Sequence, residues 1–242
     1  MTQNIYDDAG FFENYSQLPR SVHGLAGAPE WGSLQDLLPR IRGLDVLDLG
    51  CGYGWFCRWA AEQGARGVLG VDVSEQMLTR ARVMTQQAVI RYERADLERF
   101  TPPAGFGLAY SSLAFHYLVD LGGLLKRVHD ALVPGGMLVC SVEHPMVTAP
   151  RHQGWSEDES GLPTWPVGGY LDEGPRSTDW LAKGVIKQHR TIETYLALLS
   201  RAGFTLTCLR EWGPSPEQVA TNPDWAKERN RPPFLLLSCR RA

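Results

Sequence analysis

The residues best suited to chemistry directly follow an apolar run, where three glycines stand at alternate positions. Residues 46–49 lead into Gly50, Gly52 and Gly54, and an amphipathic run begins at Trp55. Because glycine has no Cβ, the chain can turn tightly there, and a ligand can lie against the backbone amides at the start of the next helix. The spacing therefore predicts a nucleotide-binding loop between a strand and a helix.

An acidic residue at the end of the next apolar run supports this prediction. Asp72 stands eighteen residues after Gly54 and directly follows residues 67–71. A carboxylate in this position can accept hydrogen bonds from both hydroxyls of a ribose. The alternative is that the glycines only form a turn before a helix, and the register of Asp72 makes that alternative less favoured. The two signals together indicate an adenosine-containing ligand.

The glycine spacing separates the families that could bind such a ligand. A phosphate-binding Walker loop requires Gly-Lys-Ser or Gly-Lys-Thr, which this loop lacks. Enzymes that bind dinucleotides use G-x-G-x-x-G, and Trp55 stands where their last glycine allows close helix packing. An NAD(P)-dependent oxidoreductase is one alternative that stays open, and a nucleotide-binding module without catalytic activity is another.

The pattern D-x-G-x-G-x-G from Asp48 to Gly54 resembles the first motif of the class I S-adenosylmethionine-dependent methyltransferases. The resemblance extends from about Leu44 to the end of the chain, includes the turn at residues 132–136, and is closest in detail to the small-molecule "type 11" group. It implies an enzyme that transfers a methyl group from S-adenosylmethionine to a small-molecule acceptor by in-line displacement and releases S-adenosylhomocysteine. Family members that methylate amides or nucleobase amines carry Asn/Asp-Pro-Pro-Tyr after the fourth strand. Ser-Ser-Leu-Ala stands there in this chain, so such acceptors are not expected.

The resemblance also implies which residues hold the cofactor. Asp48 and residues 50–54 match the cradle of the methionine part, Asp72 the ribose acid, and Asp96 a position near the adenine amino group. Residues 111–116 match the lining of the methionine end. Within the first 43 residues, an arginine could pair with the cofactor's carboxylate and a tyrosine could close over it. The complete expected set is Tyr15, Arg20, Asp48, Gly50, Cys51, Gly52, Tyr53, Gly54, Asp72, Val73, Met77, Ala95, Asp96, Leu97, Ser111, Ser112 and His116.

The acceptor is expected at the carboxyl edge of the sheet, where strand ends and an inserted segment meet. His116 and His144, after the fourth and fifth strands, are candidate general bases. The alternative for His144 is a histidine hydrogen-bonded in the turn before Pro145, and His189 has a similar structural alternative. The expected acceptor contacts are Glu143, His144, Tyr170, Trp180 and His189.

The alternation of apolar runs with amphipathic segments predicts an α/β fold. The resemblance implies a Rossmann-like, doubly wound sheet with helices on both faces, whose seven strands follow the order 3-2-1-4-5-7-6 with strand 7 antiparallel. Residues 1–43 are expected to form an N-terminal helical cap, and residues 44–242 a methyltransferase domain with a lid-like insertion at about 144–188. The expected strands are residues 45–49, 67–71, 89–93, 106–111, 137–142, 204–212 and 234–240.

Composition and charge exclude several classes of partner. The chain has 242 residues with 24 Lys and Arg against 27 Asp and Glu, a formal net charge of −3, and no basic run, so no nucleic-acid partner is expected. Its apolar stretches fall far short of the roughly 20 residues that cross a bilayer, so no membrane partner is expected. The five cysteines lack C-x-x-C spacing and no signal peptide precedes them, which predicts reduced thiols in the cytoplasm. The histidine spacing predicts no metal site, and the oligomeric state, monomer or homodimer, stays open.

Overall fold

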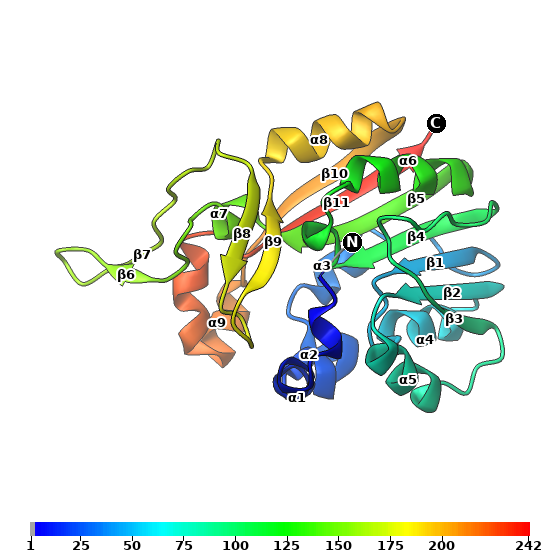
Figure 1. The fold of residues 1–242 in the computed structure, drawn as a ribbon, viewed down its shortest axis with the longest axis horizontal. Coiled ribbons are helices and arrows are strands. Elements are labelled where there is room, and N and C mark those ends of the chain that lie inside the picture. Colours follow the sequence, from blue (N-terminus) through cyan, green and yellow to red (C-terminus); the bar gives the residue numbers. More distant parts are fainter. Residues whose placement is uncertain (1–2) are drawn as a thin grey trace.

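The computed structural model describes residues 3–242 and contains a central seven-stranded sheet (Figure 1). The strand order β10-β11-β5-β4-β1-β2-β3 confirms the predicted order, with β10 and β11 as the expected sixth and seventh strands. Neighbouring strands of this sheet are parallel except β11, which runs antiparallel to both β5 and β10. The strands are β1 (Asp45–Leu49), β2 (Gly67–Asp72), β3 (Ile90–Arg94), β4 (Phe106–Ser112), β5 (Leu132–Glu143), β10 (Phe204–Trp212) and β11 (Phe234–Arg241).

Helices cover both faces of the sheet, as predicted, because each presents an apolar stripe to it (Figure 1). On one face, α6 (Leu121–Ala131) and α8 (Ile192–Arg201) share a buried apolar core with β4, β5 and β11. On the other, α3 (Trp31–Gln35), α4 (Trp55–Glu62) and α5 (Glu75–Met84) contribute to a second core. The sheet therefore stands between two apolar layers, and its strand ends stay free to form a site.

Several helices begin at a residue whose side chain accepts a backbone hydrogen bond, among them α5, α6 and α8. Asp120 and Thr191 start α6 and α8 in this way, as the sequence predicts. Ser74 starts α5, with 3.1 Å between its Oγ and the backbone nitrogen of Met77. This last cap fixes the turn directly after β2, where the predicted ribose acid lies.

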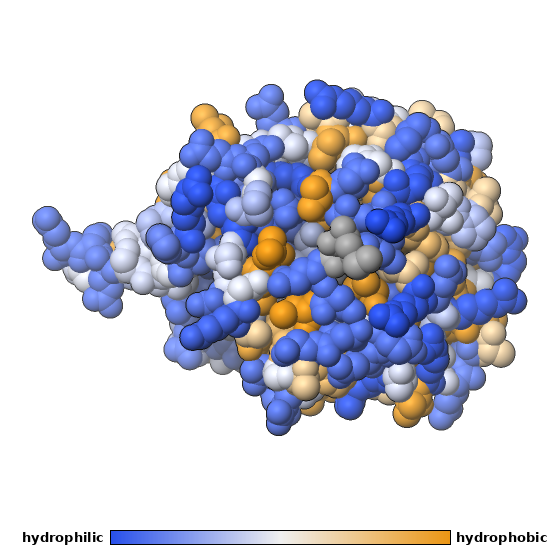
Figure 2. Space-filling model, viewed as in Figure 1, coloured by the Kyte–Doolittle hydropathy of each residue, from blue (hydrophilic) through white to orange (hydrophobic). Residues whose placement is uncertain are grey.

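The segment between β5 and α8 contains two hairpins that were not expected. After α7 (Pro145–Thr148), the strands β6 (Ser156–Glu157) and β7 (Pro163–Thr164) form a short hairpin on an arm that projects from the molecule (Figures 1 and 2). The strands β8 (Gly174–Thr178) and β9 (Val185–His189) form the second hairpin. Strands this short, interrupted by Gly and Pro, give no alternating pattern that a sequence reading can detect.

Short helices precede the first strand, where a helical cap is predicted. They are η1 (Ile5–Asp7), α1 (Ala9–Ser16), α2 (Pro19–Val22) and η2 (Gly24–Gly27), followed by α3. The carboxylate of Asp7 accepts a hydrogen bond from Ser74 Oγ at 2.5 Å, and the side chain of Asn14 donates to Leu181 O at 2.9 Å. This N-terminal segment thus connects the start of α5 with the turn of the β8–β9 hairpin.

Between β10 and β11, α9 (Pro216–Thr221) and η4 (Pro223–Arg229) form a second unexpected helical segment. Ser215 and Gln218 form a capping box, in which each side chain accepts a hydrogen bond from the backbone N–H of the other. Gln218 also donates to Pro29 O at 3.0 Å. The α9–η4 segment therefore lies against the N-terminal segment, although almost 190 residues separate them in the sequence.

Candidate functional site

The carboxyl ends of β1, β2, β4 and β5 open into a cavity of about 930 Å³. Its walls come from the N-terminal segment, the loops after these strands, Trp180 in the turn between β8 and β9, and the α9–η4 segment. Ligand pockets in proteins usually measure about 300–1,000 Å³. This cavity therefore stands near the upper end of that range and has room for more than one small ligand.

The glycine loop forms one side of the cavity, and each of its glycines has a positive φ: 79° at Gly50, 52° at Gly52 and 69° at Gly54. A Cβ at Gly50 would lie 2.5 Å from the Cβ of Ala114, and one at Gly54 would lie 2.1 Å from the hydroxyl of Tyr92. At Gly52, no heavy atom would lie within 4 Å, and Gly52 lines the cavity. The loop thus packs closely on both sides and leaves an open cradle at its middle.

Asp72 lies beside this cradle and is held by two backbone hydrogen bonds. Its Oδ2 accepts from Gly52 N at 2.8 Å and its Oδ1 from Ser74 N at 2.9 Å. Burial raises the pKa of Asp72, against the opposing effect of these N–H donors. Each carboxylate oxygen can accept a further hydrogen bond, so the fixed side chain can bind a diol at the edge of the cavity.

Asp48 lies behind the loop and does not line the large cavity. It is 2% exposed, accepts a hydrogen bond from Cys57 Sγ at 3.1 Å, and burial raises its pKa to about 7. It borders a smaller adjoining cavity of about 90 Å³, whose lining includes Tyr15 and Gly52 as the large one does. The two cavities meet at the glycine loop.

The structure brings most of the predicted cofactor contacts together around these two cavities. Those that line the large cavity are Tyr15, Arg20, Gly50, Gly52, Asp72, Val73, Met77, Asp96, Leu97, Ser112 and His116. Those that line only the smaller one are Asp48, Cys51 and Tyr53. Gly54, Ala95 and Ser111 line neither, and the hydroxyl of Ser111 instead donates to Leu49 O at 2.7 Å.

The predicted arginine of the N-terminal segment already has an acidic partner. Arg20 Nη2 donates to both carboxylate oxygens of Glu30, at 3.0 and 3.2 Å, and Glu30 is completely buried. Arg20 lines the large cavity together with Tyr15, whose pKa is raised by burial. An anionic ligand at Arg20 would therefore have to compete with Glu30 for the guanidinium group.

At the other end of the cavity, Glu143 is the last residue of β5 and forms a buried ion pair with Lys187 of β9. Lys187 Nζ donates to Glu143 Oε1 at 2.6 Å and lies 4.9 Å from the ring centroid of Trp180. Glu143 Oε2 is buried and has no hydrogen-bond partner among residues 3–242. Lys187 was not among the predicted residues. The only sequence signal was its place on the inward face of β9, two residues from Val185 and His189.

His116 follows β4 and lies next to Glu143. Its Nδ1 accepts a hydrogen bond from Glu143 N at 3.3 Å, and its side chain is almost completely buried while lining the cavity. Burial lowers the pKa of His116 to about 4, so the ring is neutral near pH 7. The hydroxyl of the next residue, Tyr117, accepts from Tyr6 OH at 3.3 Å and also lines the cavity.

His144, His189 and Tyr170 do not reach the cavity, and their polar atoms serve the local structure. His144 Nδ1 accepts from Met146 N at 3.1 Å at the start of α7, and its Nε2 lies 2.9 Å from Glu211 Oε1. The nitrogens of His189 lie 2.8 Å from Thr148 Oγ1 and 2.9 Å from Tyr170 O. Both histidines are therefore hydrogen-bonded within local structure, which is the alternative to a role in catalysis or substrate binding. Neither ring has a free nitrogen that could contact the methyl acceptor.

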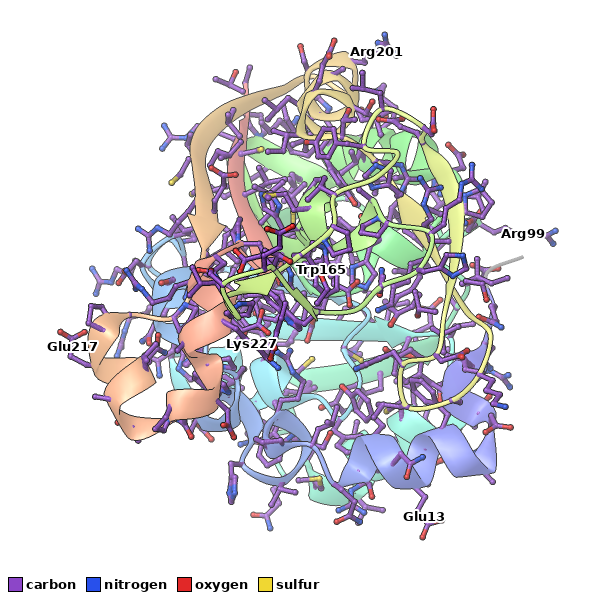
Figure 3. All side chains as sticks on the ribbon, turned by 90° about the vertical axis from the view of Figure 1, so that its left-hand side faces the viewer. Glu13, Arg99, Trp165, Arg201, Glu217 and Lys227 are labelled. Carbon is purple, nitrogen blue, oxygen red and sulfur yellow. The ribbon has the colours of Figure 1, made fainter. Side chains whose placement is uncertain are left out.

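The α9–η4 segment supplies an unexpected wall of the cavity. Its lining residues are Glu217, Gln218, Thr221, Asn222 and Trp225. Figure 3 labels Glu217 and Lys227, which lie on this segment. The capping box was the only signal in the sequence, and it indicated a helix without indicating what the helix covers.

Within residues 3–242, no group of three or more His, Cys, Asp or Glu side chains lies close enough together to hold a metal ion. In the same described range, no helix has the length and apolar character required to span a membrane.

Comparisons with known proteins agree with this geometry. A family model described as a methyltransferase domain matches residues 46–136. The crystal structure of an S-adenosylmethionine-dependent methyltransferase from Mesorhizobium loti has a TM-score of 0.87 and 53% sequence identity, over 90% of this chain and 100% of that one. A malonyl-[acyl-carrier protein] O-methyltransferase of Pseudescherichia vulneris is 37% identical over 62% of this chain and 56% of its own length. A trans-aconitate 2-methyltransferase of Sinorhizobium fredii is 40% identical over 43% and 41%.

Proposed function

Because this chain belongs to the class I S-adenosylmethionine-dependent methyltransferases, we propose that it binds the cofactor at the glycine loop and methylates a small molecule in the remainder of the cavity. The observation that carries the proposal is the open cradle at Gly52, directly beside the fixed carboxylate of Asp72. The sequence left two alternatives open, an NAD(P)-dependent oxidoreductase and a nucleotide-binding module without catalytic activity. Membership of this enzyme family argues against both.

The residues of the large cavity fit the parts of the cofactor. The carboxylate of Asp72 would accept hydrogen bonds from the ribose hydroxyls, and the apolar side chains of Val73, Met77 and Leu97, which line the same cavity, would enclose the adenine. The loop at residues 50–54 leaves its backbone accessible to the methionine part, next to the smaller cavity. Bound there, S-adenosylmethionine supplies an electrophilic methyl group on a sulfonium sulfur.

The contribution of the protein to methyl transfer is to align the acceptor and to exclude water. The N-terminal segment closes the cavity against the β8–β9 hairpin. Gln3 donates to Gly184 O at 3.0 Å and accepts from Ile186 N at 2.9 Å, and Asn14 donates to Leu181 O. The ring of Trp180 packs 5.6 Å from that of Phe11. These contacts shield the reacting atoms from solvent.

A small acceptor is supported by the size of the cavity and by the names of two relatives. One relative is named for a malonyl group on a carrier protein and the other for trans-aconitate. The chain spans only about half or less of the length of these two enzymes, so their acceptors are not transferred to it.

Calorimetric titration with S-adenosylhomocysteine tests the proposal. Replacement of Asp72 by Ala removes a charged hydrogen-bond partner and should weaken binding about 5- to 150-fold, which corresponds to roughly 1–3 kcal/mol. Asp36→Ala is the matched control, because the Asp36 side chain is 69% exposed and lies outside the cavity. Wild-type protein that does not bind the ligand, or an Asp72→Ala variant that binds as tightly as Asp36→Ala, contradicts the proposal.

A further inference from the structure

A cluster of polar side chains lies in the cavity beyond the predicted cofactor contacts. Glu143 ends β5, and His116 follows the adjacent strand β4, so the sheet itself brings the two side chains together. Both residues line the cavity, and Lys187 pairs with one oxygen of Glu143. The other oxygen, Oε2, is buried and has no hydrogen-bond partner within the described part of the chain. A buried carboxylate oxygen without a donor costs free energy, so its presence beside a cavity points to a ligand that supplies one.

The hydrogen bonds of His116 determine which atom of its ring is a donor. Nδ1 accepts from the backbone N–H of Glu143, so in the neutral ring the proton resides on Nε2. Nε2 makes no hydrogen bond within the described part of the chain and is not a fully buried atom. The neutral ring therefore offers an N–H donor at this end of the cavity. It does not offer a lone pair, so it is not suited to remove a proton from the acceptor.

The charges around the cavity restrict the acceptor further. Among the lining residues that the structure describes, Arg20 is the only Lys or Arg, and Glu30 already pairs with it. Lys187 is paired with Glu143 in the same way. The acidic residues that line the cavity are Asp72, Asp96, Glu143 and Glu217. At the acceptor end of the cavity, an anionic acceptor would meet the carboxylate of Glu143 and no unpaired Lys or Arg among the described lining residues, so the protein would not compensate desolvation of its charge.

We propose, on the basis of the proposed function, that the acceptor is a non-anionic compound with an N–H or O–H group, an amine or an alcohol. Its N–H or O–H donates to Glu143 Oε2, which takes up the proton when the methyl group leaves the sulfonium sulfur, with the sulfur keeping the electron pair, and bonds to that nitrogen or oxygen. His116 Nε2 donates to the second lone pair of an alcohol oxygen or, for an amine, to a neighbouring acceptor atom, so that the attacking lone pair stays free. Lys187 is a positioning residue, because it holds the Glu143 carboxylate through Oε1 and leaves Oε2 for the acceptor. Carboxylic acids are excluded by the same arrangement.

The test compares two probe classes on the wild-type enzyme with S-adenosylmethionine, and release of S-adenosylhomocysteine is the readout. One class is a panel of primary amines, alcohols and phenols. The other is a panel of carboxylic acids that includes malonate and trans-aconitate. We expect turnover with members of the first panel alone. Turnover of a carboxylic acid, or of no amine, alcohol or phenol, overturns the inference.

Binding measurements on variants supply a second test that does not need turnover. Glu143→Gln leaves Lys187 unpaired, so the variant with bound S-adenosylhomocysteine should bind trans-aconitate at least tenfold more tightly than wild type. Glu143→Gln combined with Lys187→Met is the matched control, because it removes both charges and should not gain this affinity. An equal affinity of wild type and Glu143→Gln for trans-aconitate overturns the inference.

The failure of this inference can be distinguished from failure of the proposed function. Titration with S-adenosylhomocysteine alone reports on the cofactor site, and all three proteins should bind it within about threefold of one another. If they bind it but the acceptor results go against expectation, only the acceptor assignment is wrong. If wild type does not bind it, the proposed function fails first.

Discussion

Gly54 shows at the scale of a single residue why the loop is built from glycine. Its φ of 69° lies in the left-handed region, and a Cβ would lie 2.1 Å from the hydroxyl of Tyr92. Gly43 has a similar φ of 81° but no heavy atom within 4 Å of a Cβ. An alanine at Gly43 would therefore meet only the backbone strain of a positive φ, whereas an alanine at Gly54 would also meet a steric clash.

We expect Gly54→Ala to destabilise the protein more than Gly43→Ala does. In both variants the left-handed backbone lowers the free energy of unfolding by about 1–2 kcal/mol. Gly54→Ala should lower it by roughly 1–3 kcal/mol more, because the ring of Tyr92 must move to make room for the added methyl group. Denaturant unfolding of the two variants measures the difference, and equal free energies of unfolding would show that Tyr92 does not restrict this position.

The buried ring of His116 makes stability depend on pH. Its pKa is about 4 in the folded protein, against 6.5 for the ordinary side chain, and burial is the main cause. Below pH 6.5 the unfolded chain takes up a proton that the folded protein does not. The free energy of unfolding therefore falls as the pH is lowered from 6.5 to 4, and the full shift corresponds to roughly 3 kcal/mol.

This prediction is checked by unfolding wild type and His116→Gln at pH 7.5 and 4.5. Wild type should lose roughly 2–3 kcal/mol more than the variant between these pH values. The pKa values of His144 and His189 are also lowered, so they act in the same direction, but they are present in both proteins. A loss that is the same in both proteins would show that His116 can be protonated without cost.

Single residues were predicted well where a local pattern required them and less well where distant contacts decide their role. Gly50, Gly52 and Asp72 have a fixed place in a strand–loop–helix unit, so their spacing located them at the cavity. The side chain of His144 is oriented by its contact with Glu211, and that of His189 by its contact with Thr148. Their spacing in the sequence gives no sign of these partners.

At the scale of elements, the β8–β9 hairpin contributes one aromatic side chain to the wall of the cavity. Trp180 lines the cavity, lies over Lys187 at 4.9 Å and packs edge-on against Phe11 at 5.6 Å. Trp155, in the arm, packs on Trp165 instead and does not line the cavity. The two tryptophans therefore form a pair for comparison, one in the β8–β9 turn and one in the arm.

Trp180→Ala should weaken binding of S-adenosylhomocysteine about 2- to 10-fold, because aromatic contacts of this kind contribute roughly 0.5–1.5 kcal/mol each and hold Tyr15 and Phe11 in place. Trp155→Ala should bind the ligand as wild type does. Calorimetric titration measures both. If the two variants bind alike, the hairpin does not contribute to closing the site.

The strands of the main sheet were predictable because each buries a run of apolar residues. The hairpins β6–β7 and β8–β9 were not, since their strands have two to five residues and partly face solvent. The lid-like insertion was expected as a segment without regular structure, and its role as a lid stays a prediction. The α9–η4 segment was missed because its apolar residues are few and none of them is buried.

At the scale of the whole molecule, the cavity exists only because distant segments meet. Residues 3–29 and the α9–η4 segment are joined by the hydrogen bond from Gln218 to Pro29, and the β8–β9 turn is joined to the N-terminal segment by that from Asn14 to Leu181. The sheet order was predictable from the family resemblance, whereas these long-range contacts leave no pattern in the sequence. The oligomeric state and the cytoplasmic location stay predictions.

The most direct test of the central claim is a crystal structure of the protein with S-adenosylhomocysteine. We predict that both ribose hydroxyls lie within hydrogen-bond distance of the Asp72 carboxylate, with the methionine part along residues 50–54 and free volume between the sulfur and Glu143. Ligand density outside this cavity, or a ribose that does not contact Asp72, would contradict the account.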